Sequence, residues 1–231
     1  IIDHTQFCFI RGRQGDAAEL VRGLLDHFHE CMKHPVHIVI NMKNSSNDKI
    51  DSMKAWKTTY TKQYSDIIRH YFGQYVSILT CTHCRHVSKT YESFLVLTLP
   101  TTHGCSSLSD CIEKLCELET IDGVQCDHCK TKRTCTKQIQ LCMLPRYLFI
   151  KIVMKTKNIS FDYSFHSTIF NKTTTYNLDS VIYHSGSQRG GHYYAYKKLP
   201  SGHYMLDDDD VTKINRLHTK NMAMICYTKC G

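Results

Sequence analysis

The segment Gly-Gly-His-Tyr-Tyr-Ala-Tyr at residues 190–196, followed by Leu-Asp-Asp at 206–208, decides the fold of the C-terminal part of this chain. His192 begins a predicted strand directly after a glycine turn, and Asp207 ends the next predicted strand. A hairpin between these strands brings the two side chains together. A histidine that is oriented by a carboxylate supplies two thirds of a nucleophilic triad. The third member, a nucleophile, is not evident beside them.

Composition limits the class of protein. The chain has 231 residues, 42 % of them apolar, which is enough for a real core in one large domain or two small ones. No apolar run is long enough to cross a membrane, so we predict no membrane association. The net charge is +8, but the lysines are scattered and no arginine-rich helix is present, so nucleic acid is not the favoured partner.

Residue patterns divide the chain into a helical N-terminal part and a strand-rich remainder, which predicts an α+β architecture. Residues 16–31 repeat apolar side chains with helical periodicity, and 56–71 form a second helical or irregular segment. The polar stretch 41–54 is typical of a loop. A short helix is predicted at 109–119. Strands rich in β-branched and aromatic residues are predicted at 75–79, 86–99, 137–141, 146–154, 177–184, 192–198, 203–206 and 221–228, with a turn at 185–191.

Two Cys-x-x-Cys pairs are the strongest local motif. Cys81 and Cys84 form one pair, Cys126 and Cys129 the other, with 41 residues between them. Each pair presents two thiolates on one turn, and two such pairs complete a closed tetrahedral zinc site of the structural kind. Buried inert thiols and a redox pair are the alternatives, but neither pair lies between a strand and a helix of a βαβ unit.

The total number of cysteines indicates the cellular compartment of the protein. The chain has 13 cysteines and no recognisable secretory signal, which predicts a reducing, intracellular location in the cytoplasm, the nucleus or both. His83 and His128 lie inside the two cysteine pairs, and we expect them to be exposed turn residues rather than ligands.

Further segments accompany these motifs in a fixed order. They are Gln-Gly-Asp-Ala-Ala-Glu-Leu at 14–20, Tyr-Phe-Gly-Gln-Tyr-Val-Ser at 71–77, Lys-Thr-Tyr-Glu-Ser-Phe at 89–94, Leu-Thr-Leu-Pro at 97–100, Thr-Lys-Gln at 136–138, Leu-Pro-Arg-Tyr-Leu at 144–148, Tyr-His-Ser-Gly-Ser at 183–187 and Asn-Met-Ala-Met-Ile-Cys-Tyr at 221–227. Together with the cysteine pairs and the Gly-Gly-His segment, they resemble the ubiquitin-specific proteases, papain-like cysteine deubiquitinases. The resemblance is collinear from about residue 14 to the end of the chain.

This resemblance implies a hand-like fold of thumb, palm and fingers. It divides the partial catalytic domain 1–231 into a thumb remainder at 1–75, zinc-binding fingers and palm at 76–145, and palm with the His and Asp segments at 146–231. The zinc pairs would lie at the fingertips. Ubiquitin or a ubiquitin conjugate would be held by the fingers, with its tail led between thumb and palm.

The resemblance also assigns catalytic roles. His192 would be the general base that takes the proton from a cysteine thiol, and Asp207 would hold its imidazole in the useful tautomer. Asp208 would assist the oxyanion site through a water or a side-chain bond. The structural alternatives are a strand histidine with a satisfied backbone bond and a solvated acidic turn.

Substrate contacts are implied for five residues. Asp16 and Glu19 would meet the basic tail of ubiquitin, with helix N-capping as the alternative for Asp16. Gly190 and Gly191 would let the backbone approach that tail without a Cβ in the way. His184 would belong to a blocking loop that shifts when substrate enters.

The nucleophile remains to be found. The family's cysteine lies upstream of the segment at 14–20, at a helix N-terminus. Cys8 is the one candidate upstream in this chain, and it lacks the preceding asparagine. The chain starts with Ile1 rather than methionine, so we expect an N-terminally truncated and inactive piece of a longer, monomeric protease. The alternatives are a non-catalytic, zinc-stapled module that binds ubiquitin or another protein, and a zinc ribbon that binds nucleic acid.

Overall fold

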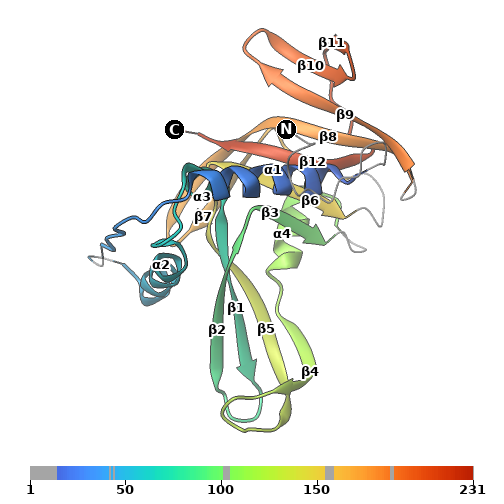
Figure 1. The fold of residues 1–231 in the computed structure, drawn as a ribbon. Coiled ribbons are helices and arrows are strands. Elements are labelled where there is room, and N and C mark those ends of the chain that lie inside the picture. Colours follow the sequence, from blue (N-terminus) through green and yellow to red (C-terminus); the bar gives the residue numbers. More distant parts are fainter. Residues whose placement is uncertain are drawn as a thin grey trace.

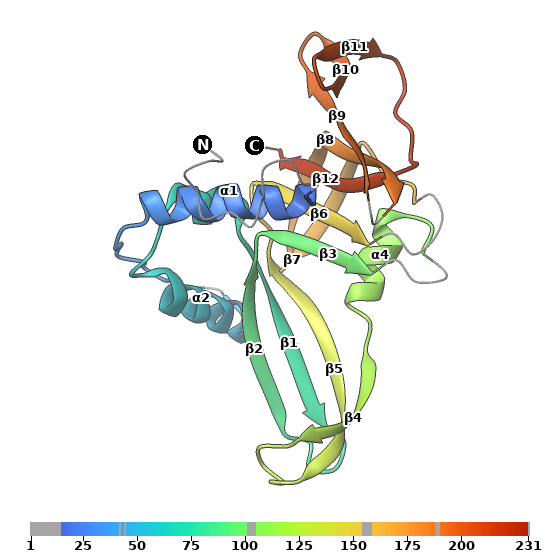
Figure 2. The ribbon, with the colours of Figure 1, turned by 45° about the vertical axis from the view of Figure 1, so that its right-hand side comes forward.

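The structure is a computed structural model that describes residues 15–41, 43, 45–100, 105–153, 159–187 and 190–230. Two sheets organise it. A large sheet carries helices α1 and α4 beside it, and a narrow four-stranded sheet extends away from the large one, as the two ribbon views show (Figures 1 and 2). This arrangement confirms the predicted α+β class.

The large sheet has eight strands. Seven follow the order β11-β10-β9-β8-β12-β6-β3, and β7 pairs with β8. All neighbours are antiparallel except β3 and β6, which run parallel. The strands are β3 (Val96–Pro100), β6 (Tyr147–Val153), β7 (Ser164–Ile169), β8 (Lys172–Ser187), β9 (Gly190–Leu199), β10 (Gly202–Asp207), β11 (Asp210–Ile214) and β12 (Met222–Lys229).

The main core lies on the large sheet. Ile150, Val181 and Tyr196 are completely buried, and each comes from a different strand. Buried tyrosines keep their hydroxyl groups bonded. Tyr176 Oη donates to Pro145 O at 2.6 Å, and Tyr227 Oη donates to Asp162 O at 2.8 Å. The core is therefore rich in aromatic rings without leaving their polar ends unsatisfied.

The narrow sheet has the order β2-β1-β5-β4, all antiparallel. Its strands are β1 (Gly73–Cys81), β2 (Val87–Phe94), β4 (Glu119–Gln125) and β5 (Lys132–Met143). Far from the large sheet, β1 turns into β2 and β4 turns into β5, and both turns lie at the free end (Figure 2). We call this sheet the fingers and the large sheet the palm.

Four helices accompany the sheets in the part of the chain that the structure describes. Asp16 caps α1 (Ala17–Met32) by accepting from the N–H groups of Ala18 and Glu19, as expected from the sequence. Ser65 caps α3 (Asp66–Tyr71), and Ser107 forms a capping box with Asp110 at α4 (Leu108–Leu115). No helix among the described residues is long and apolar enough to cross a membrane.

The prediction of a loop at 41–54 was wrong over its second half. Helix α2 (Asn47–Tyr60) begins there, with Ser46 as its N-cap. Only Ser52 and Tyr60 of this helix are buried, so its sequence lacks the apolar stripe by which a helix is usually recognised.

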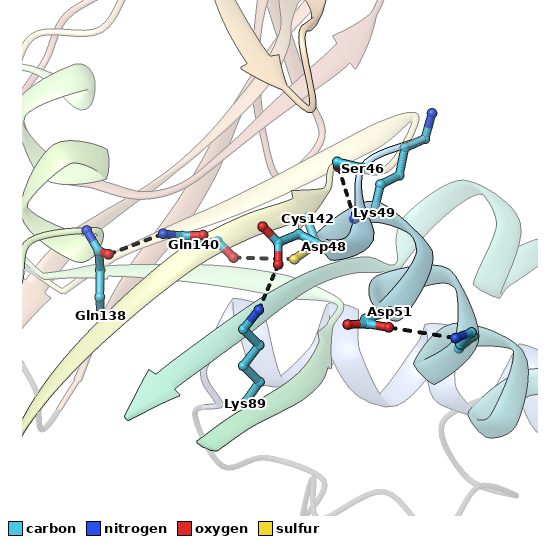
Figure 3. A network of polar contacts seen from close by, with 9 residues as sticks. Ser46, Asp48, Lys49, Asp51, Lys89, Gln138, Gln140 and Cys142 are labelled. Atoms are coloured by element: carbon cyan, nitrogen blue, oxygen red, sulfur yellow. Dashed lines mark hydrogen bonds and ion pairs between the residues drawn. The ribbon is translucent and has the colours of Figure 1, made fainter. Parts of the chain in front are cut away.

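Specific bonds hold α2 on the fingers. Asp48 receives a hydrogen bond from Lys89 Nζ at 2.7 Å, and Ser52 Oγ donates to the buried Gln74 Oε1 at 2.6 Å. Figure 3 shows the first of these contacts and the side chain of Cys142 on β5 next to the helix. Polar contacts with the sheet therefore help to position α2, together with the buried ring of Tyr60.

The strand boundaries also differ from the prediction. The expected turn at 185–191 is shorter, because β8 continues to Ser187 and β9 starts at Gly190. The stretch 86–99 is two strands, β2 and β3, which lie in different sheets. Three strands, β4, β7 and β11, were not predicted. Every second side chain of β7 is exposed, and most side chains of β4 and β11 are exposed.

Candidate active site and metal centre

The palm brings His192 and Asp207 together. In the β9–β10 ladder Leu206 pairs with Ala195, so Asp207 lies one step further, diagonally across from His192. The two side chains form a hydrogen bond between Nε2 of His192 and Oδ1 of Asp207. The hairpin predicted from the sequence therefore places the pair as expected.

Asp207 controls the charge of this histidine. Its hydrogen bond and its negative charge raise the pKa of His192, and the charge of Asp208 adds a smaller effect in the same direction. Since Nε2 faces Asp207, Nδ1 is the ring nitrogen left to exchange a proton with another group. Both side chains are about half exposed, at 49 % for His192 and 50 % for Asp207, so the site is accessible.

Asp208 lies in the tight turn that joins β10 to β11. Its φ is +50°, a left-handed conformation that aspartate tolerates better than most residues. One carboxylate oxygen lies with the His192 ring nitrogen and the Asp207 carboxylate in a group whose atoms are all within 4.8 Å of one another. Asp208 is thus part of the same polar cluster.

The glycine before His192 allows a close backbone approach. A Cβ on Gly191 would lie 2.3 Å from Nε2 of His184 and 2.6 Å from the carbonyl oxygen of Ser185. The His184 ring in turn lies against Tyr193, with 4.5 Å between ring centroids. His184 and Ser185, expected in a loop, are paired residues of β8, and Ser185 lies opposite His192 in the ladder.

Asp16 has a structural role at the start of α1. Besides capping the helix, it accepts from Lys151 Nζ of β6 at 2.8 Å. Partial burial opposes its ionisation, but the bonds from Lys151, Glu19 and Ala18 outweigh that effect and lower the pKa of Asp16. Glu19, one turn further along, remains exposed.

The four paired cysteines gather at the far end of the fingers. Their sulfur atoms all lie within 4.8 Å of one another. The Sγ–Sγ distance is 4.0 Å for Cys81 and Cys129 and 3.7 Å for Cys84 and Cys126. Sulfurs about 2.3 Å from a zinc ion at the corners of a tetrahedron are about 3.8 Å apart, so the donor set fits such an ion.

The electrostatics of the cluster also suit a cation. Bonds from the backbone N–H groups of Cys84 and His83 hold the pKa of Cys81 down to about 6, although burial opposes this. Contact with Cys84, followed by burial, raises the pKa of Cys129 to about 12. The first thiolate forms readily and a further one is opposed, which is the situation that a divalent ion relieves. His128 and His83 are exposed, as predicted.

A cleft of about 370 Å³ was missed by the sequence analysis. It lies where α1 faces the junction of β2 and β3, and Arg22 and Asp26 line it from the helix. Burial raises the pKa of Asp26, partly offset by His29 and Arg22. Glu19, Arg22 and Asp26 are three and then four residues apart, a spacing that places them on one helix face and that could have identified the cleft.

The sequence of the chain was compared with models of known protein families. The model of the family described as "Ubiquitin carboxyl-terminal hydrolase" matches residues 2–227. The chain belongs to this family. The ubiquitin carboxyl-terminal hydrolase match therefore covers the palm, the fingers and the helices together.

Curated relatives of the family are similar over most of the chain. Ubiquitin carboxyl-terminal hydrolase Usp2 of Drosophila melanogaster is 30 % identical, covering 81 % of this chain and 22 % of the relative. Ubiquitin carboxyl-terminal hydrolase 5 of Saccharomyces cerevisiae is 29 % identical over 90 % of this chain and 31 % of its own length. The chain thus spans less than a third of these two relatives.

Solved structures show the same fold. One of them is a structure of the SAGA DUB module that contains Ubp8. The match covers 95 % of the present chain and 51 % of the matched chain, with a TM-score of 0.72 and 16 % identity. Another, bound to ubiquitin aldehyde, matches 80 % of this chain and 48 % of its own, with a TM-score of 0.63 and 19 % identity. The ubiquitin-specific protease fold is therefore confirmed.

No cysteine forms a hydrogen bond with His192 in the part of the chain that the structure describes. Cys111, Cys142 and Cys226 are buried in the body of the protein, and burial raises the pKa of each thiol. Cys8 lies outside the described residues. The described site thus contains the hydrogen-bonded pair of His192 and Asp207.

Proposed function

We propose that this chain is the part of a cysteine-type deubiquitinase that supplies the general base, and that the reaction is hydrolysis of the isopeptide bond after the C-terminal glycine of ubiquitin. The observation that carries the proposal is the bond between His192 and Asp207 in a chain of this family. The names of the relatives and the ubiquitin aldehyde bound to a structural neighbour support the substrate.

His192 and Asp207 perform the proton transfers. Nδ1 of His192 takes the thiol proton, and the thiolate then attacks the carbonyl carbon of ubiquitin's last residue. Asp207 stabilises the imidazolium, since its charge already raises the pKa of His192. His192 then gives the proton to the leaving amine, and a water deprotonated by the same ring hydrolyses the thioester. Asp208 assists the oxyanion through a water or its side chain.

The approach to this pair is suited to an extended, basic tail. Gly190 and Gly191 carry no Cβ, and the cleft beside α1 holds Asp26 with Glu19 on the same helix face. The tail of ubiquitin contains arginines, for which carboxylates are the natural partners. Asp16 contributes by fixing the start of α1 through Lys151, in addition to any contact with the tail.

Zinc is proposed for the four fingertip cysteines. Cys81, Cys84, Cys126 and Cys129 would hold it with no open position, so it would stabilise the fingers and take no part in the chemistry. The high number of cysteines, 13 in the chain, supports a reducing location, in the cytoplasm or the nucleus. We propose a monomer whose nucleophile is a cysteine outside the described residues.

The test uses the full natural protein and ubiquitin with a thiol-reactive C-terminus. A covalent adduct in the intact mass is expected for the parent protein, and peptide mapping then identifies the cysteine. His192→Ala should form the adduct about 100-fold or more slowly, the usual contribution of a general base. His166→Ala is the matched control, because this exposed histidine lies on β7 and its ring bonds Thr175 of β8.

The 231 residues by themselves are expected to form no adduct. An adduct on these residues that Cys8→Ala abolishes would show that the nucleophile lies within them. A full protein that retains ubiquitin but never reacts would instead favour the non-catalytic, zinc-stapled binding module.

A further inference from the structure

A pocket of about 270 Å³ lies on the side of the molecule that the proposed reaction does not use. It is enclosed by α2, the last residues of β5, the β7–β8 hairpin and the end of β12. Along β8 the pocket residue Tyr176 is nine positions from Ser185, which lies opposite His192. At about 3.3 Å per residue, this places the pocket about 30 Å from the candidate active site.

The inside of this pocket is apolar. Met53 of α2, Met143 and Leu144 at the end of β5, and Phe170 at the hairpin tip line it. Methionine side chains adapt their shape to different partners and are frequent at surfaces that bind peptides. The interior therefore suits a single large apolar side chain rather than a polar ligand.

The rim of the pocket is positive. Lys49, Lys172 and Lys229 come from three different elements, and no aspartate or glutamate lines the pocket with them. Within the described residues none of these three lysines forms an ion pair, whereas other lysines of the chain do. Lys49 and Lys229 are only partly exposed.

The walls of the pocket are preformed. The buried bond between Ser52 and Gln74 holds α2 in place along one side. The Asp48–Lys89 pair, shown in Figure 3, adds a second contact. On the other side, Phe170 and Asn171 form the two-residue turn of the β7–β8 hairpin, with the positive φ values, +48° and +61°, that such a tight turn requires.

We propose that this lysine-rimmed pocket binds an acidic peptide segment of a partner protein. One large apolar side chain of the peptide would fill the pocket, and carboxylates on either side would pair with Lys49, Lys172 and Lys229. Three separate cations match a segment with several carboxylates better than a small molecule with one. The chain's net charge of +8 further favours the encounter with an acidic partner.

The test uses the 231-residue chain with ¹³C-methyl methionine and an acidic probe peptide, acetyl-Asp-Glu-Phe-Asp-Glu-amide. Saturable shifts of the Met53 and Met143 methyl signals are expected, while those of the buried palm residues Met222 and Met224 stay in place. The affinity should fall about tenfold between 50 and 500 mM salt, because the rim charges are accessible to screening.

Two triple variants separate the pocket from the overall charge. Replacement of Lys49, Lys172 and Lys229 by glutamate should weaken binding about tenfold or more. The same replacement at Lys43, Lys62 and Lys198, which are exposed and do not line the pocket, should change it less than twofold. His192→Ala should bind as the parent does, so failure of the proposed hydrolysis leaves this result untouched.

Several outcomes would overturn the proposal. One is the absence of Met53 and Met143 shifts at millimolar peptide, and another is equal loss of affinity in both triple variants. Equal binding of the peptide with glycine in place of phenylalanine would show attraction to surface charge alone. Shifts produced by decanoate but not by the peptide would make the occupant a small apolar anion instead.

Discussion

The palm and the fingers are both antiparallel sheets over most of their area, but different interactions hold them. The palm buries a continuous core in which Ile150, Val181, Tyr183 and Tyr196 are fully excluded from solvent. The free end of the fingers has only a small cluster around the cysteines, and β4 there exposes most of its side chains.

This difference shows how one chain combines a rigid site with a long extension. The palm can hold His192 and Asp207 in register because its strands are anchored by buried side chains on several neighbours. A narrow sheet cannot bury enough apolar area to order its own end, and four sulfur atoms that could hold a metal ion gather there instead.

The strongest way to test this contrast is to remove the metal. Because zinc binding contributes about 10 kcal/mol to the folding of small zinc domains, a chelator or Cys126→Ser should unfold the end of the fingers. Hydrogen exchange is expected to accelerate across β4 and the ends of β1 and β5, while β8 and β12 stay protected. Cys31→Ser, at an exposed thiol, is the control. Loss of protection in the palm as well would show that the two sheets are one cooperative unit.

A core truncation in the palm should have the next largest effect. Ile150→Ala removes a fully buried side chain in the middle of the sheet and should lower the free energy of unfolding by about 2–5 kcal/mol. Val211→Ala, at a side chain that is 66 % exposed, should change it by less than about 0.5 kcal/mol. Chemical denaturation measures both, and similar values for the two would contradict a palm held by its core.

A smaller effect is expected at the glycines. Gly191→Ala would place a Cβ 2.6 Å from the Ser185 carbonyl oxygen, and we expect a loss of about 1–3 kcal/mol in the palm. Gly123→Ala in the fingers meets open space, so only its φ of +73° opposes the change, at about 1 kcal/mol. Thermal unfolding of the metal-bound protein gives both values. A larger loss for Gly123 would mean that the fingers are packed more tightly than the structure shows.

The smallest effect on stability, but the most informative for the site, is expected for Asp207→Asn. The pKa of His192 is raised in the folded protein, so this pair stabilises the fold below about pH 6.5 and the contribution fades as the pH rises through the raised pKa. The variant should therefore differ from the parent at about pH 5–6 and approach it at pH 9. NMR titration of His192 should show a lower pKa in the variant, with exposed His166 unchanged. An unchanged His192 titration would remove Asp207 as the orienting acid.

Much of the fold was predictable because its signals are local. The alternating strands near His192, the helical periodicity at 16–31 and the paired cysteines each occupy a few residues with a fixed period or spacing. The first half of helix α2 and strands β4, β7 and β11 escaped prediction because many of their side chains are exposed. Such elements are defined by hydrogen bonds to neighbours that are distant in sequence.

The sequence by itself determined the chemistry that the chain carries: a histidine and an acid on adjacent strands, four zinc-type ligands and the family to which they belong. Only the tertiary structure decided which groups meet. It turned Asp16 toward Lys151, placed the His184 ring beside Gly191 and assembled three lysines from separate elements around one pocket. Residue types and short spacings can be read directly from the sequence. Contacts between elements that are distant in sequence depend on how the sheets and helices pack in space.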